Sequence, residues 1–99
     1  MIVIAGSIPV KAEKREEAVA AALVMAAATQ KEEGCITYQF YSNLADPNTL
    51  FIFEEWENAK TLAAHGETSH MAEFRKVLPE VVNGPAALKK YEIAFAEPL

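Results

Sequence analysis

The stretch Cys35–Glu57, CITYQFYSNLADPNTLFIFEEWE, decides the fold of this chain. Two runs rich in β-branched and aromatic residues, Cys35–Tyr41 and Thr49–Glu57, flank a segment of turn-forming residues, Ser42–Asn48. The stretch is therefore predicted to form a hairpin of two antiparallel strands.

The alternation along this hairpin predicts two unlike faces, if Tyr41 pairs with Leu50. One face is apolar and is expected to pack on helices; it carries Ile36, Tyr38, Phe40, Phe51 and Phe53. The other face mixes polar and large apolar side chains, namely Cys35, Thr37, Gln39, Tyr41, Leu50, Ile52, Glu54 and Trp56. Such a face is seldom left open to water, so a second sheet or a ligand cavity is expected to cover it.

The segments on either side of the hairpin supply the other elements. An interior strand, apolar on both faces, is predicted over Met1–Pro9, and a long helix over about 12–33, ended by Gly34. After the hairpin, Asn58 is a good N-cap for a helix over Ala59–His65.

Gly66 interrupts that second helix, a further piece is expected over about 70–79, and Leu88–Phe95 alternates as a last strand. The order strand, helix, strand, strand, broken helix, strand is the ferredoxin-like β-α-β-β-α-β arrangement. The chain is therefore predicted to be α+β, with helices on one face of a four-stranded antiparallel sheet.

The length, net charge and composition of the chain exclude some classes of function. The chain has 99 residues and is expected to form a single domain, 1–99. Its net charge of −5 repels phosphate backbones, which argues against nucleic acid as a partner. The lone Cys35 cannot form an internal disulfide, and no apolar run is long enough to span a membrane. A cytoplasmic location is the expectation.

Two stretches resemble a known family. The first is Glu33–Tyr41, EGCITYQFY, and the second is Phe53–Asn58, FEEWEN, continued by Ala64–Phe74, AHGETSHMAEF. They are similar to the antibiotic-biosynthesis monooxygenase pattern, roughly E-x-G-C-x-x-Y, then E-x-W, then A-H-x-x-[ST]-x-H. The resemblance covers nearly the whole chain.

The resemblance implies a ferredoxin-like subunit whose open sheet face packs on a second copy, giving a dimeric α/β barrel. Members of that family include monooxygenases that work without a cofactor and oxidise hydroquinones or polycyclic phenols to quinones. Others isomerise a phosphorylated autoinducer sugar, and many have no assigned activity. The fold is thus better indicated than the reaction.

His65, His70 and Trp56 are the candidate catalytic residues. His65 matches a histidine of the family and could deprotonate a phenol, although a histidine at a helix end also caps backbone carbonyls. His70 could act beside it or simply fill space at the start of a helix. Trp56 could form a wall against which an aromatic substrate stacks, or it could be a core residue.

A substrate pocket is predicted on the mixed face, lined by Thr37, Gln39, Tyr41, Ile52 and Glu54. Glu54 could act as an acid or base if desolvated, but an ion pair with Lys89, Lys90 or Arg75 is the favoured interpretation. Cys35 has no evident base beside it and is not expected to be a nucleophile.

No metal and no cofactor are expected. The histidines are five residues apart, whereas zinc-binding helices use three or four, and no third ligand is evident near them. The isolated glycines form no phosphate-binding loop for a dinucleotide or flavin.

Three functions remain open at this point. The first is a cofactor-independent monooxygenase that uses molecular oxygen on a small aromatic substrate. The second is an isomerase of a small phosphorylated sugar, and the third is a dimer that binds a ligand without catalysis. A homodimer is expected in each case, joined through the sheet face bearing Thr37, Gln39, Ile52 and Trp56.

Overall fold

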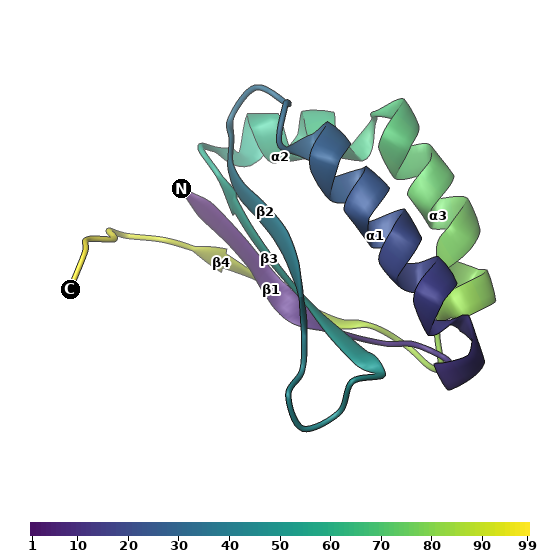
Figure 1. Cartoon of the computed structure of the whole chain (residues 1–99). Helices are drawn as coiled ribbons and strands as arrows, with labels where there is room; N and C mark the ends of the chain where they lie inside the picture. Colours follow the sequence, from purple (N-terminus) through teal and green to yellow (C-terminus); the bar gives the residue numbers. More distant parts are fainter.

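A four-stranded antiparallel sheet carries all the helices on one face, as a computed structural model of residues 1–99 shows (Figure 1). The strands are β1 (Ile2–Pro9), β2 (Cys35–Ser42), β3 (Thr49–Trp56) and β4 (Ala87–Glu92), in the sheet order β2-β3-β1-β4. The helices are a 3-10 turn (Ala12–Lys14), α1 (Arg15–Thr29), α2 (Ala59–Gly66) and α3 (Ser69–Val81).

This arrangement confirms the predicted α+β fold class and element order. β1 is an interior strand, paired with both β3 and β4, as its apolar faces predicted. The second helix is broken, with α2 and α3 separated by Glu67 and Thr68. Three bounds differ most from expectation. The first α-helix ends at Thr29 and is followed by turns up to Gly34, α3 continues past Pro79 to Val81, and β4 ends at Glu92 rather than Phe95.

The predicted register of the hairpin is wrong by one residue. Ser42, not Tyr41, pairs with Leu50, so that Tyr41 lies opposite Phe51 and Phe40 opposite Ile52. The hairpin closes where the Asn43 N–H donates to the Thr49 carbonyl at 3.0 Å, and the Asn43 side chain accepts hydrogen bonds from the backbone N–H groups of Ala45 and Asp46 within the turn. Because side chains alternate along a strand, a slip of one residue exchanges the two faces of β3.

The corrected register moves more than half of the predicted mixed face to the helix-facing side, including Cys35, which pairs with Trp56. The helix-facing side of the sheet carries Ile2, Ile8, Tyr38, Phe40, Leu50, Ile52, Glu54 and Trp56. Phe51 and Phe53, predicted to pack on helices, lie instead on the open face. A β-bulge between Cys35 and Thr37 also turns Ile36 outward, where it is exposed rather than part of the core.

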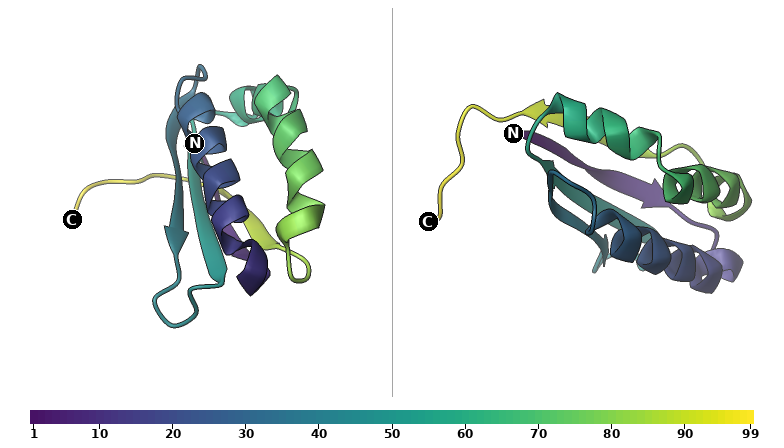
Figure 2. Two further views of the ribbon diagram at one scale, coloured as in Figure 1. Left: turned by 45° about the vertical axis from the view of Figure 1, so that its right-hand side comes forward. Right: turned by 90° about the horizontal axis from the view of Figure 1, so that it is seen from above.

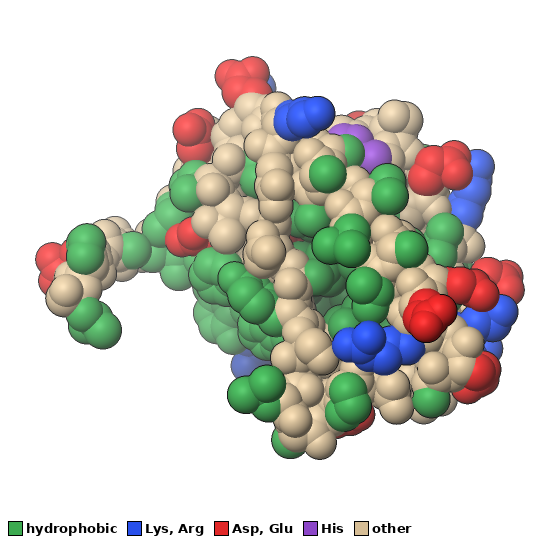
Figure 3. All heavy atoms as spheres, viewed as in Figure 1, with side chains coloured by type: hydrophobic (Ala, Val, Ile, Leu, Met, Phe, Trp, Pro, Cys, Tyr) green, Lys and Arg blue, Asp and Glu red, His purple; other side chains and the backbone are tan.

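The open face of the sheet is therefore defined by the residues that pair across the strands: Val3, Ala5, Ser7, Thr37, Gln39, Tyr41, Phe51, Phe53, Glu55, Ala87, Lys89 and Tyr91. No element of the chain covers it, as the two turned views show (Figure 2). Hydrophobic side chains gather beside the strands on the surface of the molecule (Figure 3). Ile52 and Trp56, predicted to join two subunits, cannot do so because both are buried beneath the helices.

Beyond β4, residues 93–99 run away from the body of the molecule (Figures 1 and 2). Their connection to the sheet is the hydrogen bond that the Ile93 N–H donates to the Met1 carbonyl, 2.9 Å. None of the helices combines the length and the hydropathy needed to cross a lipid bilayer.

We predict a homodimer joined through the open sheet face, and that Phe53→Glu dissociates it. Obligate interfaces bury about 2,000 Å² or more, and the central position of Phe53 would place the new carboxylate inside such an interface. An uncompensated buried charge costs about 3–5 kcal/mol, whereas the same charge on a free subunit faces water. Sedimentation at micromolar concentration measures the outcome.

Leu44→Glu is the matched control, because Leu44 lies fully exposed in the β2–β3 turn. It should sediment like the wild type. A wild-type monomer of 10.8 kDa, or a Phe53→Glu variant that stays dimeric, would show that this face is not the interface.

Candidate functional site

Three side chains from different parts of the chain meet at one end of the helical layer. Glu32 lies in the turns after α1, His65 in the last turn of α2, and His70 in the first turn of α3. One carboxylate oxygen, Glu32 Oε2, lies 2.7 Å from His65 Nδ1 and 2.7 Å from His70 Nε2. A carboxylate only accepts hydrogen bonds, so both of these ring nitrogens donate to it.

Local backbone geometry holds this cluster together. The Thr68 hydroxyl donates to the His65 carbonyl at 2.8 Å and accepts from the Met71 N–H at 3.3 Å, which links the end of α2 to the start of α3. On the other side, Gly34 has a φ of +81°, and a Cβ there would clash with the Thr61 side chain. The turn that carries Glu32 therefore requires glycine at position 34.

His65 is buried against the aromatic side chains of the sheet. Its ring centroid lies 4.8 Å from that of Trp56 and 5.5 Å from that of Tyr38. The Trp56 Nε1–H in turn donates to Glu54 Oε1 at 2.9 Å. A continuous series of contacts thus runs from Glu32 through His65 and Trp56 to Glu54.

Glu54 is a buried carboxyl group with no Lys or Arg partner, so the predicted ion pair with Lys89, Lys90 or Arg75 is wrong. Burial raises the pKa of Glu54, while the hydrogen bond from Trp56 and the charge of His65 partly offset that effect. The result is a carboxylate that accepts a proton more readily than an exposed one.

A cavity of about 400 Å³ lies between α3, the segment leading into β4, and the helix-facing side of the sheet. Its walls are mostly apolar and include Phe40, Ile52, Met71, Phe74 and Leu78. The only polar side chains in the lining are those of Tyr38 and Glu54. Burial also raises the pKa of Tyr38, so its hydroxyl stays protonated and can donate a hydrogen bond.

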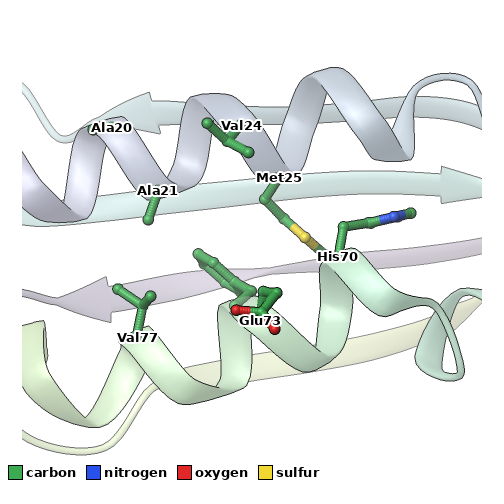
Figure 4. Close-up of a pocket in the computed structure, with 8 residues that line it drawn as sticks. Ala20, Ala21, Val24, Met25, His70, Glu73 and Val77 are labelled. Atoms are coloured by element: carbon green, nitrogen blue, oxygen red, sulfur yellow. The ribbon is translucent and has the colours of Figure 1, made fainter.

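A second hollow of about 340 Å³ lies between α1 and α3 (Figure 4). It is lined from α1 by Ala20, Ala21, Val24 and Met25, and from α3 by His70, Glu73, Phe74 and Val77. His70 is therefore shared between this hollow and the Glu32 cluster.

The structure brings some of the predicted site residues together and separates others. His65, His70, Trp56 and Glu54 form one connected group, and Ile52 lines the same cavity as Glu54. Thr37, Gln39 and Tyr41 project from the open face of the sheet and line no part of that cavity. There the Thr37 hydroxyl donates to the Glu55 carboxylate.

Sequence reasoning missed Glu32 and Tyr38. Glu32 directly precedes the stretch that carries the family resemblance, but its contact with two helices depends on the fold. Tyr38 was assigned to the core, and it is indeed buried, but it also lines the cavity. Burial and nearby carboxylates raise the pKa of the Cys35 thiol to about 11, which supports an unreactive cysteine.

Comparison with known proteins agrees with this fold. An uncharacterised protein of Synechocystis is 37% identical over 98 residues, which are 99% of this chain and 67% of that protein. The Bacillus subtilis protein named "Putative monooxygenase YcnE" is 30% identical over 94 residues, covering 95% of this chain and 99% of the relative.

A solved structure from Bacteroides thetaiotaomicron, described as a conserved protein of unknown function and possible oxidoreductase, is 34% identical with a TM-score of 0.86. The match covers 93% of this chain and 96% of that one. A Deinococcus radiodurans structure with 23% identity has a TM-score of 0.92 and supports the fold, covering 100% and 98% of the two chains. The sequence model named "Antibiotic biosynthesis monooxygenase" matches residues 1–77, and the chain belongs to that family.

Proposed function

We propose that this chain is a monooxygenase that oxidises a hydroquinone or polycyclic phenol to a quinone with molecular oxygen, without a cofactor. The observation that carries the proposal is the position of Glu54, a buried carboxyl group in the wall of an otherwise apolar cavity. Membership of the monooxygenase family supports the reaction class.

The cavity suits a flat aromatic molecule. Its volume of about 400 Å³ lies in the range of about 300–1,000 Å³ that is usual for small-molecule sites. Phe40 and Phe74 meet in its wall, with ring centroids 5.9 Å apart, and Met71 adds a flexible apolar surface.

The proposed chemistry begins with proton transfer from the substrate hydroxyl to the Glu54 carboxylate. The resulting phenolate transfers one electron to dioxygen, and the two radicals combine to form a peroxide on a ring carbon that bears hydrogen. Loss of water from that peroxide leaves a carbonyl group. One oxygen atom enters the quinone and the other leaves as water, while the substrate loses two hydrogens. Apolar walls favour these steps by excluding bulk water.

The neighbouring side chains have supporting roles in this proposal. The Tyr38 hydroxyl donates a hydrogen bond to the substrate oxygen as negative charge develops there. The Trp56 Nε1–H holds the Glu54 carboxylate in place. His65 does not line the cavity, so we assign it a positioning role behind Trp56, with His70 and Glu32 fixing its ring.

The alternative of a phosphorylated sugar is less well supported. A phosphate group needs cationic partners, and no Lys, Arg or His side chain lines this cavity. Its single charged group is a carboxylate, which repels phosphate.

Glu54→Gln is expected to lower kcat/KM for an oxidisable phenol by about 10²–10⁴, the usual contribution of a positioned base. Oxygen uptake with a panel of hydroquinones and polycyclic phenols measures this. Glu55→Gln is the matched control, since Glu55 is the adjacent carboxylate on the open face of the sheet, and it should keep full activity. An inert wild type across the panel, or equal activity in Glu54→Gln, would contradict the proposal.

The same variant should be more stable than the wild type at pH 8. The folded-state pKa of Glu54 lies above its unfolded value, so between the two the folded protein binds more protons and stability falls as the pH rises. Glutamine removes this cost and still accepts the Trp56 hydrogen bond. Thermal melts should show a gain at pH 8 that shrinks as the pH falls toward the ordinary glutamate pKa of about 4.3. A Glu54→Gln variant less stable than the wild type at pH 8 would argue that the carboxylate is structural.

His65→Ala should reduce kcat/KM by up to about 100-fold, because a shift of about 1 Å in a catalytic group can cost that much. Its stability cost should exceed about 0.5 kcal/mol, the upper range of typical surface changes, since His65 is buried and packs on Trp56.

Trp56→Phe keeps an aromatic ring but removes the N–H that donates to Glu54. It should therefore raise the pKa of Glu54 and move the acid limb of the activity profile to higher pH. Oxygen uptake across pH on folded samples tests both variants. If both variants kept the wild-type kinetics, His65 and Trp56 would have no role in positioning Glu54.

A further inference from the structure

Three metal-ligating atoms lie close together where the side chains of Glu32, His65 and His70 meet. The Glu32 Oε2, His65 Nδ1 and His70 Nε2 atoms all lie within 4.8 Å of one another. We propose that these three side chains form a binding site for a divalent transition-metal ion such as Zn²⁺. The site lies outside the cavity that contains Glu54, because none of the three residues lines it, and its test measures zinc binding rather than turnover.

Small side-chain movements would convert the hydrogen-bonded cluster into a coordination site. Around an ion with bonds of about 2.1 Å, neighbouring donor atoms lie about 3.0–3.4 Å apart. The Glu32 oxygen is now 2.7 Å from each ring nitrogen, so each of these pairs needs to open only slightly. The two ring nitrogens must draw together, and His70, in the first turn of α3 with 22% of its side chain exposed, has room to turn.

The charge around the cluster favours a cation. The Glu32 side chain is only 13% exposed, and its charged-group contacts are the two histidines, with no Lys or Arg among them. A buried carboxylate is stabilised by a nearby counter-charge, and a bound divalent cation would supply one. The net charge of −5 acts in the same direction over longer distances.

The donor set selects the class of ion. Two imidazole nitrogens with one carboxylate oxygen suit Zn²⁺ and its transition-metal neighbours better than Mg²⁺ or Ca²⁺, which prefer oxygen ligands alone. An ion can reach the cluster from outside, because histidine atoms are visible at the surface (Figure 3) and His70 borders the hollow between α1 and α3 (Figure 4).

The expectation of no metal rested on the five-residue spacing of the histidines and the lack of a third ligand. Both premises fail in the structure. The histidines belong to two separate helices, so helical spacing does not govern their separation, and Glu32 supplies the third donor.

Calorimetric titration of the 99-residue chain with zinc chloride tests the proposal. One ion should bind per chain. Glu32→Gln and His70→Gln should each weaken binding more than about 100-fold, because loss of even an outer-shell partner costs about 10–100-fold. Glu73→Gln is the matched control: it removes an exposed carboxylate on α3 and should leave zinc affinity unchanged.

A second measurement needs no variant. The chain has only two histidines, so the imidazole nitrogen signals of the wild type in NMR report on this site directly. Zinc should shift the His65 Nδ1 and His70 Nε2 signals together, at one equivalent. A protein that binds no zinc, binding that persists in Glu32→Gln and His70→Gln, or imidazole signals that zinc leaves unchanged would each overturn the proposal.

Discussion

The Glu32 carboxylate accepts hydrogen bonds from two imidazole rings on two different helices, and this contact ties together the ends of α1, α2 and α3. Hydrogen bonds to a charged group typically stabilise by about 1.5–3 kcal/mol each. They also determine which nitrogen of each ring carries the proton. Because His65 packs on Trp56, and Trp56 donates to Glu54, the position of Glu54 in the cavity depends on this contact at the opposite end of the series.

The site combines two carboxyl groups in different surroundings. Glu32 has two hydrogen-bond donors on one oxygen, whereas Glu54 has a single donor and is raised in pKa chiefly by burial. Neither is neutralised by Lys or Arg. A protein that keeps an under-compensated carboxylate in its core accepts a cost in stability, and such costs are commonly found where a side chain has a chemical task.

The sequence predicted the elements of this fold much better than the contacts between them. Alternating side chains identified both strands of the hairpin, and Gly66 indicated the break between α2 and α3. The register could not be derived in the same way, because it depends on where the turn closes, which is at Asn43 and Thr49. An error of one residue places Trp56 and Ile52 on the wrong face. The two histidines were identifiable as candidates from their match to the family pattern. Glu32 could not be identified as a candidate from the sequence, because its two histidine partners lie more than thirty positions away in the chain.

The sheet order β2-β3-β1-β4 also governs how the chain folds. The hairpin of β2 and β3 joins neighbouring segments, so it can form early and with little loss of loop entropy. β1 is synthesised before the other three strands, yet Ile2 pairs with Trp56 on one side and with Glu92 on the other. β1 therefore stays unpaired until β3 has followed it, and its exposed apolar edges are open to misassembly or chaperone binding during that interval.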